Sequence, residues 1–350
     1  MKIALITDQH IGFKNDSADY LNYFTRFYEN VFFPYLDEHK IGTVIDLGDT
    51  LDRRKYVNFN TLAAFHKIWL EPLRDRNITM HCIIGNHQSY YKNTTDINSA
   101  ALLHQIEGLD MNVYQTPQDV KFDGLSIAML PWINRENIDD SMEFVKNSKS
   151  SVLMGHLELS GYQAIKGITF DHGMDPGKFS KFSRVFSGHF HTKQQKGNVD
   201  YLGSPYEMSF ADFGSDKGFH IFDTETLEIQ FIKNPEKMHI YLPYDDTKVD
   251  YIKADIEAYR NKVVKINVIE KNDSYLFEKF IERLVSVNPI KYTIIDNTEV
   301  IDFGVADDSY ESKDTMSILV DYVQENFEDE HDQSEIIKLM RELYNEAISG

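Results

Sequence analysis

Apolar residues in the first half of the chain form short runs separated by longer segments with helical spacing. The runs have the length of buried strands. They occupy residues 3–7, 43–47, 80–84, 126–130, 151–155 and 184–187. After the first run, apolar side chains recur on one face of a helix at Leu21, Phe24, Phe27, Val31 and Phe32. This alternation of strands and helices predicts an α/β fold.

The second half of the chain predicts a change of organisation near residue 240. Two apolar runs within 218–233 indicate a hairpin that closes a first domain over 1–240. A strand, a helix and a strand follow and predict a small α+β module over 241–302. Residues 303–313 are polar and predict a linker, and two amphipathic helices are predicted over 314–350.

The composition indicates an ordinary globular protein of 350 residues with 42% hydrophobic residues. The first apolar run is broken by Asp8, which is too early for an export signal or a membrane span. Cys82 is the only cysteine, which rules out an intrachain disulfide and a thiolate zinc cluster. These features favour a cytoplasmic protein.

The net charge of −20 is unfavourable for a protein that binds nucleic acid. The excess is uneven, however, because residues 301–350 hold fourteen acidic side chains against three basic ones. More than half of the excess therefore lies in the predicted helical tail, and the charge does not exclude a nucleic-acid substrate for the first domain.

Polar residues of the kinds that bind metals follow the predicted strands. In open α/β sheets ligands bind beyond the carboxyl ends of strands, so one site can collect these residues. Asp8 and His10 are two positions apart, which points both side chains the same way if the segment is extended. Four others, Asp49, Asn86, His156 and His189, each follow a glycine, which allows a sharp turn, and His191 stands two positions after His189. The candidate ligands are Asp8, His10, Asp49, Asn86, His156, His189 and His191.

One such residue alone would be a weak signal, because a strand-end Asp or His is usually a cap, a turn residue or solvated. Five strand-end motifs of Asp, Asn and His together favour a dinuclear metal site. A carboxylate such as Asp49 can bridge two cations. A set of nitrogen and oxygen donors without sulfur suits manganese, iron or zinc.

The order of these motifs, D-x-H, G-D, G-N-H, G-H and G-H-x-H, resembles that of the calcineurin-like metallophosphoesterases. The sequence YLGSPYEMSFAD over 201–212 resembles the GSP-containing segment of the SbcD-type nuclease subunits. Within that family, the length and the order of regions are similar to those of the bacteriophage recombination endonuclease subunits. The resemblance implies a two-sheet sandwich flanked by helices, a capping domain over 241–302 and a partner-binding tail.

The resemblance also implies roles for the candidate residues. One metal would bind Asp8, His10 and His191, and the other Asn86, His156 and His189, with Asp49 bridging. The implied cofactor is a pair of divalent ions, manganese in this family. His87 matches the family's histidine that contacts the scissile phosphate and stabilises or protonates the leaving oxygen.

One position departs from the family pattern. Relatives commonly read G-N-H-D where this chain reads Gly85-Asn86-His87-Gln88. A neutral amide in place of a carboxylate would not raise the pKa of the neighbouring histidine. We therefore hypothesise that general-acid catalysis by His87 is weakened, and that Gln88→Asp would raise activity or move the pH optimum upward.

The implied function is a metal-dependent DNA exonuclease and endonuclease that acts at DNA ends in recombination and repair. In this family the tail docks on the coiled-coil base of an SMC-like ATPase of the SbcC type, and members are homodimers. Scattered cations of the module could contact DNA, namely Lys253, Arg260, Lys262, Lys265 and Lys271. No membrane partner is expected, and the expected cytoplasmic location is the host cytoplasm if a phage encodes the chain.

Three other functions stay open at this point. A phosphatase or cyclic-nucleotide phosphodiesterase would use the same metals, but would not need the 201–212 segment, the module or the tail. A weakly active scaffold subunit would account for Gln88 but not for all seven ligands. A nonenzymatic nucleic-acid binder is disfavoured by the charge of −20.

Overall fold

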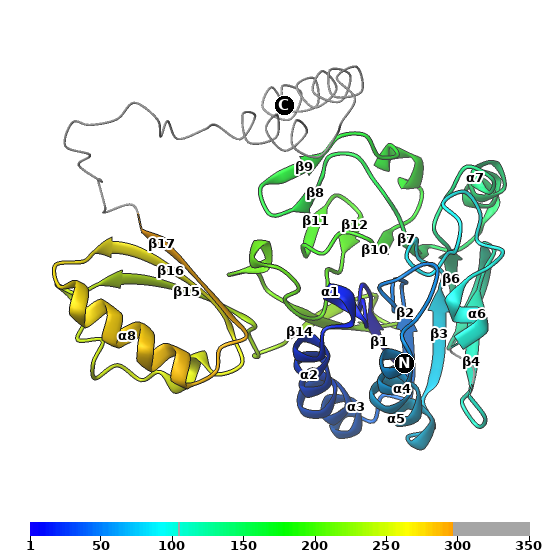
Figure 1. Cartoon of the computed structure of the whole chain (residues 1–350). Coiled ribbons are helices and arrows are strands. Elements are labelled where there is room, and N and C mark those ends of the chain that lie inside the picture. The colour runs from blue at the N-terminus through cyan, green and yellow to red at the C-terminus, as the bar shows by residue number, and fades with distance from the viewer. Residues whose placement is uncertain (104–105, 297–350) are drawn as a thin grey trace, which may run out of the picture. The chain divides into compact units, whose positions relative to one another are not determined.

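The computed structural model describes residues 1–103 and 106–296. Two six-stranded sheets and their helices form the body that holds the strand-end motifs (Figure 1). The first sheet has the order β14-β13-β1-β2-β3-β4 and the second β11-β12-β10-β7-β6-β5. The central strands of each sheet run parallel, so their carboxyl ends lie at one edge.

The strands of the first sheet are β1 (Lys2–Ile6), β2 (Thr43–Asp46), β3 (Thr79–Ile83), β4 (Met111–Tyr114), β13 (Gly218–Asp223) and β14 (Ile229–Lys233). Those of the second are β5 (Gln118–Phe122), β6 (Leu125–Leu130), β7 (Val152–His156), β10 (Arg184–Gly188), β11 (Gln194–Lys196) and β12 (Val199–Tyr201). A separate hairpin pairs β8 (Tyr162–Ile165) with β9 (Ile168–Phe170). The predicted hairpin within 218–233 is confirmed as the antiparallel pair β13 and β14.

Helices cover the outer faces of the sheets. The predicted long helix is confirmed as α2 and α3, which a π-helical turn at Tyr28–Phe32 joins. A second π-helical turn, at His66–Leu70, joins α4 to α5. The helices are α1 (Phe13–Asp16), α2 (Ala18–Phe27), α3 (Phe33–His39), α4 (Phe59–Phe65), α5 (Glu71–Asp75), α6 (Ser99–Leu103) and α7 (Ile138–Asn147).

The core has three layers because the central strands are buried on both faces. Alternate residues of β1 point to opposite sides, so Ile3 and Leu5 pack between the two sheets. Ala4 and Ile6 pack against the aromatic face of α2 and its neighbours. A third cluster, which includes Val145 of α7, covers the outer face of the second sheet. Burial on both faces explains why the strands read as unbroken apolar runs.

The small module is a three-stranded parallel sheet with one helix. Its strands are β15 (His239–Asp245), β16 (Val263–Glu270) and β17 (Lys291–Asp296), in that order. Helix α8 (Ser274–Ser286) is capped at its N-terminus by Asp273, whose side chain accepts hydrogen bonds from the N–H groups of Tyr275 and Leu276. Phe280 and Leu284 of α8 are fully buried against the sheet. The predicted strand-helix-strand order is confirmed, and β15 is an additional strand.

The predicted α/β fold with a two-sheet sandwich is confirmed. Residues Met1–Thr298 form one compact unit, so the predicted boundary near residue 240 lies inside it and remains a prediction. The predicted linker over 303–313 and the helices over 314–350 lie outside the described residues. No helix in the described ranges combines the length and the apolar character that a bilayer span requires.

Candidate metal centre

The seven predicted ligands meet at the edge where the parallel strands of both sheets end. Asp8 and His10 follow β1, Asp49 follows β2, and Asn86 follows β3. The second sheet contributes His156 as the last residue of β7, and His189 and His191 after β10. The structure therefore brings together residues that are up to 183 positions apart in the chain.

The backbone of the ligand loops is strained rather than extended. Asp8, His10 and Asp49 have left-handed φ values of 52°, 44° and 57°. Hydrogen bonds hold this conformation, because the N–H of Asp8 donates to Gly48 O and that of His10 to Asp49 O, both at 2.9 Å. The idea that an extended segment aligns Asp8 and His10 is therefore wrong. The two side chains converge through left-handed residues.

The glycines before the ligands serve close packing more than sharp turning. A Cβ on Gly85 would lie 2.2 Å from Oδ1 of Asp49, and one on Gly188 would lie 2.0 Å from Oγ1 of Thr7. Neither glycine has a positive φ. Among these glycines only Gly48 has both a positive φ, of 105°, and no room for a side chain, because a Cβ there would lie 2.7 Å from Nδ1 of His156.

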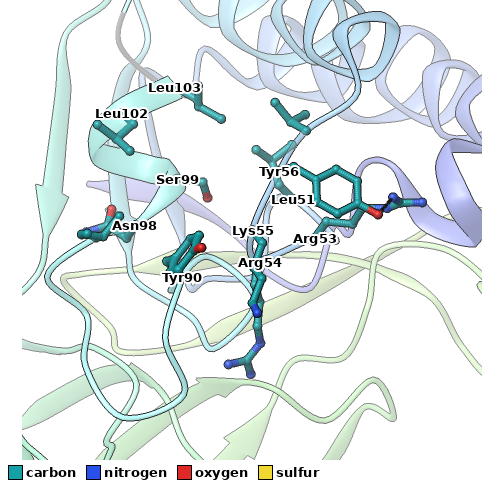
Figure 2. A pocket seen from close by; sticks show the side chains of 12 residues that line it. Leu51, Arg53, Arg54, Lys55, Tyr56, Tyr90, Asn98, Ser99, Leu102 and Leu103 are labelled. Atoms are coloured by element: carbon teal, nitrogen blue, oxygen red, sulfur yellow. Dashed lines mark hydrogen bonds between the residues drawn. The ribbon is translucent and has the colours of Figure 1, made fainter.

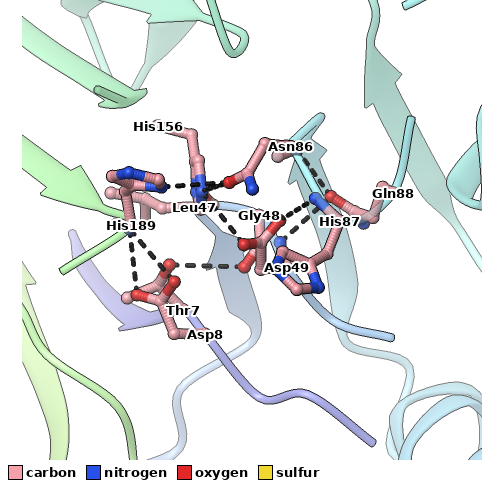
Figure 3. Close-up of polar contacts among 12 residues, drawn as sticks. Thr7, Asp8, Leu47, Gly48, Asp49, Asn86, His87, Gln88, His156 and His189 are labelled. Carbon is pink, nitrogen blue, oxygen red and sulfur yellow. Dashed lines mark hydrogen bonds and ion pairs between the residues drawn. The ribbon is translucent and has the colours of Figure 1, made fainter. Parts of the chain in front are cut away.

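The ligand atoms form two adjoining groups with the spacing of a metal site. Figure 3 shows Asp49, Asn86, His156 and His189 of this cluster together with Asp8. In the first group, which holds Asp8, His10 and His191, the two imidazole Nε2 atoms lie 3.1 Å apart. In the second, Oδ1 of Asn86 lies 2.9 Å from Nε2 of His156 and 3.0 Å from Nδ1 of His189. Donors bound to one cation at about 2.1 Å lie roughly 3 Å apart, so both groups fit divalent ions.

Asp49 lies between the two groups. Its Oδ2 is 3.2 Å from Nε2 of His156 and 3.9 Å from Nε2 of His10. Its Oδ1 accepts a hydrogen bond of 2.7 Å from the N–H of His87. A carboxylate in this position suits a bridging role.

The charges of the cluster shift the pKa values of its members. Burial alone would lower the pKa of His156, but the Asp49 carboxylate and then Asp8 raise it to about 9. Burial would raise the pKa of Asp49, but the neighbouring histidines, His156 above all, lower it well below its usual range. Burial and the nearby His10 lower the pKa of His191 well below its usual range. The metal-free site is therefore a buried, partly protonated cluster that divalent cations would complete.

The outward-facing nitrogens of the histidines are held by further groups. Nδ1 of His156 lies 2.8 Å from Leu47 O, and Nδ1 of His10 lies 3.1 Å from Oδ1 of Asp52. These contacts turn Nε2 of both rings toward the cluster. On the far side, Nε2 of His189 pairs with Glu158 at 3.4 Å. The hydrogen bond from His189 lowers the pKa of Glu158.

Sequence reasoning missed Asp52 and Glu158. Asp52 also forms a third group of potential metal-binding atoms, with His10 and His87. The signal for Asp52 was present in the sequence, because it stands three residues after Asp49 in G-D-T-L-D. Glu158 stands two residues after His156 in G-H-L-E, but the packing of β7 against β10 decides that it meets His189.

His87 lies next to the cluster but outside the two ligand groups. Its ring is 4.7 Å from that of His10, in an edge-to-face arrangement. Nδ1 is 2.5 Å from Asp52 O, which leaves Nε2 as the nitrogen available to a substrate oxygen. Burial lowers the pKa of His87, and the Asp49 carboxylate only partly opposes this.

Gln88 braces the ligand loops instead of contacting the His87 imidazole. Its Oε1 accepts hydrogen bonds from the N–H of Gly85 at 2.7 Å and of Asp49 at 3.1 Å. Its Nε2 donates to Oγ1 of Thr50 at 3.0 Å. Gln88 is fully buried, and its hydrogen bonds join the loop after β2 to the loop after β3.

We expect Gln88→Asp to weaken the affinity for divalent cations about tenfold without moving the pH optimum of hydrolysis. The shorter carboxylate has no N–H to donate to Thr50, and it cannot reach all of the present partners of Gln88. Calorimetric titration and a pH–rate profile provide the measurement, with the exposed Gln195→Asp as the control. An upward shift of the pH optimum at unchanged metal affinity would instead support a direct effect on His87.

The SbcD-like segment over 201–212 supports the ligand loops from behind. The hydroxyl of Tyr206 donates to Gln9 O, and the buried Lys217 donates to His191 O at 2.8 Å. Lys217 is fixed in turn by Asp212 at 2.5 Å and by Ser204 at 2.8 Å. Most of the segment is buried, so its visible role is to position His10 and His191.

The cations of the small module have partners within the protein. Lys253 pairs with Asp250, and Arg260 with Glu257, both at 2.8 Å. Lys262 donates to Lys237 O. Lys265 lies 4.5 Å from the ring of Phe210, and Lys271 pairs with Asp296. A DNA contact by these five side chains stays a prediction that this geometry does not favour.

Three comparisons place the chain among known proteins. No protein-family model matches it. It is 31% identical over 360 residues to "Exonuclease subunit 1" of Enterobacteria phage T4, with 99% of each chain covered. It is also similar to "DNA double-strand break repair protein Mre11" of Sulfolobus acidocaldarius, at 26% identity over 293 residues with 78% of this chain and 72% of the relative covered. The Mre11 protein of Nanoarchaeum equitans is 21% identical over 324 residues, with 82% and 84% covered.

Solved structures align less well. An archaeal phosphodiesterase covers 67% of this chain and 100% of its own at 14% identity, with a TM-score of 0.32. GAP50 of Plasmodium covers 85% of this chain and 98% of its own at 10% identity, with a TM-score of 0.39. Nothing about function follows from alignments at this level.

The two-sheet fold and its strand-end cluster define a calcineurin-like metallophosphoesterase. The full-length similarity to the phage protein assigns the chain to one family within this class. The chain belongs to the family of SbcD-type DNA repair and recombination nuclease subunits, and it is a metal-dependent DNA phosphodiesterase.

Proposed function

We propose that the chain hydrolyses phosphodiester bonds at DNA ends with two manganese ions and works with an SMC-like ATPase. One ion would be held by Asp8, His10 and His191. The other would be held by Asn86, His156 and His189, and Asp49 would bridge the two ions. The observation that carries the proposal is the convergence of these donor atoms in two groups that adjoin at Asp49.

The chemistry follows from the arrangement of the residues. When bound, two divalent cations lower the pKa of water and neutralise the charge that develops on a phosphodiester. Leu47 O and Asp52 fix the rings of His156 and His10 before any ion arrives. His87, held by Asp52 O, presents Nε2 to a leaving oxygen beside the cluster.

We expect manganese affinity to rise by up to about tenfold per pH unit between pH 6.5 and 8.5. The pKa of about 9 for His156 means that this ring is protonated in the metal-free protein at neutral pH. A bound ion requires the neutral ring, so binding releases a proton and protons compete with the metal. Calorimetry in two buffers of different ionisation enthalpy measures the released protons. Affinity that is independent of pH would contradict this assignment of His156.

A single set of assays tests the function. Linear duplex and closed circular DNA are incubated with manganese, with and without EDTA, beside a generic phosphate monoester and a cyclic nucleotide. The proposal expects EDTA-sensitive cleavage of DNA that exceeds turnover of the small esters. A preference for the small esters would support a phosphatase or cyclic-nucleotide phosphodiesterase, and no turnover at all would support a scaffold subunit. Anomalous scattering from crystals would identify the metal.

We also propose that residues 314–350 bind the coiled-coil base of an SbcC-type ATPase. The support is the apolar stripe of Leu319, Val323 and Phe327 beside an acidic face in the sequence, together with the word "subunit" in the name of the phage relative. Truncation after Lys313 should abolish co-purification with the ATPase and leave manganese binding intact. Leu319→Asp should weaken co-purification, whereas Ser317→Asp should not. Retained co-purification of the truncated chain would refute the proposal.

A homodimer is the proposed assembly. Three large apolar side chains are exposed in this part of the chain: Tyr56 (64%) in the loop after β2, Phe59 (88%) at the start of α4 and Leu102 (69%) in α6. Tyr56 and Leu102 line one pocket of about 230 Å³ (Figure 2). Apolar surface of this kind marks an interaction site. Light scattering should show a dimer that Leu102→Glu converts to a monomer. A wild-type monomer would contradict the proposal.

A further inference from the structure

Arg54 is a cationic side chain beside the metal cluster. Part of its guanidinium group has no hydrogen-bond acceptor among the described residues. It stands two residues after Asp52 in the loop after β2, and Figure 2 shows it extending away from Leu102 and Leu103. The guanidinium lies over the ring of Trp132 at 5.5 Å. Its Nη1 is buried and has no hydrogen-bond partner among the described residues. A buried donor without an acceptor is costly, so this group requires an explanation.

The neighbouring Asn86 amide leaves the other terminal nitrogen of Arg54, Nη2, without an acceptor as well. With Oδ1 turned to His156 and His189, the amide presents its oxygen to the second ligand group. Its NH2 group then faces Nη2 of Arg54 at 3.2 Å, so two donors oppose each other. In the reversed orientation the oxygen accepts from Arg54, and the NH2 group donates to His156, His189 and Asp49. Asn86 can therefore serve Arg54 or a cation, but not both.

We propose that Arg54 binds a phosphate oxygen of the DNA strand next to the metal cluster. When Asn86 turns its oxygen toward a cation, Arg54 and the Asn86 NH2 group both lack an acceptor. A phosphate oxygen supplies it by accepting from both groups, and guanidinium is well suited to phosphate. The inference rests on the proposed function and deepens it, because it couples metal loading to phosphate binding through one amide.

Arg53 shows that this situation is particular to Arg54. The adjacent guanidinium of Arg53 pairs with Asp16 at 3.3 Å and donates to Oδ1 of Asn15 at 3.0 Å. It also lies over the ring of Tyr56 at 4.7 Å. Arg53 thus has protein partners for its charge, and Arg53→Gln is a matched control with the same change of net charge.

Fluorescence anisotropy with a labelled, phosphorothioate-linked duplex tests the proposal on the full-length protein. In manganese, Arg54→Gln should weaken DNA binding about tenfold or more and reduce the slope of log affinity against log salt by about 0.9. Arg53→Gln should change affinity less than about twofold. In EDTA the loss for Arg54→Gln should shrink, because Asn86 then engages Arg54. Arg54→Lys should keep the salt slope but restore only part of the affinity.

The possible outcomes distinguish a failure of the proposed function from a failure of the proposed role of Arg54. Calorimetry should show that manganese binds Arg54→Gln at least as tightly as the wild type, which excludes damage to the metal site. If the wild type neither binds nor cleaves DNA, the proposed function fails. If the wild type does both and Arg54→Gln behaves like Arg53→Gln, the proposed function stands and the role of Arg54 is overturned.

Discussion

Asp49→Asn is expected to reduce DNA hydrolysis by about a thousandfold or more. Stabilisation by two cations contributes several kcal/mol to such a reaction, and each 1.36 kcal/mol corresponds to tenfold in rate. Asp49 is the side chain that approaches both ligand groups, through Oδ2 at 3.2 Å from His156 and 3.9 Å from His10. An amide keeps the size but removes the charge, and it places an NH2 group against an imidazole or against the N–H of His87.

The measurement is the initial rate at saturating manganese together with the bound metal per chain. We expect the wild type to bind two ions and Asp49→Asn to bind one or fewer. Asp140→Asn, which is exposed on α7, makes the same chemical change away from the site and should leave both quantities unaltered. Two bound ions and a normal rate in Asp49→Asn would exclude the bridging role.

The second large effect is expected at His87. We expect His87→Asn to lower kcat by about a hundredfold to ten-thousandfold while the metal content stays at the wild-type value. The reason is that His87 stands beside His10 at 4.7 Å but is not a member of either ligand group of the proposed pair. Its Nδ1 is occupied by Asp52 O, so its contribution must come from Nε2.

The pH profile of the same variant tests the type of contribution. Burial lowers the pKa of His87, so a protonated, acid-donating ring disappears as the pH rises through that lowered pKa. If His87 donates a proton, the wild-type rate should fall on the alkaline side and the variant should lose this limb. His39→Asn, at an exposed position near the end of α3, is the control. Loss of metal in His87→Asn would show instead that His87 is a ligand.

The fold was largely predictable because its signals are local. Strands buried on both faces must be unbroken apolar runs, and helices on a sheet must show an apolar stripe, as 3–7 and Phe24, Phe27 and Phe32 do. The strand β15 was not predicted because its sequence, HIYLPYD, mixes a proline and polar residues with its apolar ones. Its pairing with β16 is settled by contacts from elsewhere in the chain.

The sequence by itself determined which residues stand at the strand ends, since the motifs from Asp8 to His191 directly follow apolar runs along the chain. Only the tertiary structure decided how they meet. The left-handed backbone of Asp8 and His10, the bracing role of Gln88 and the conflict between Asn86 and Arg54 depend on the loops of β1, β2 and β3 packing together. His156 and His189 come from the other sheet. Such contacts are set by long-range packing, and no local periodicity encodes them.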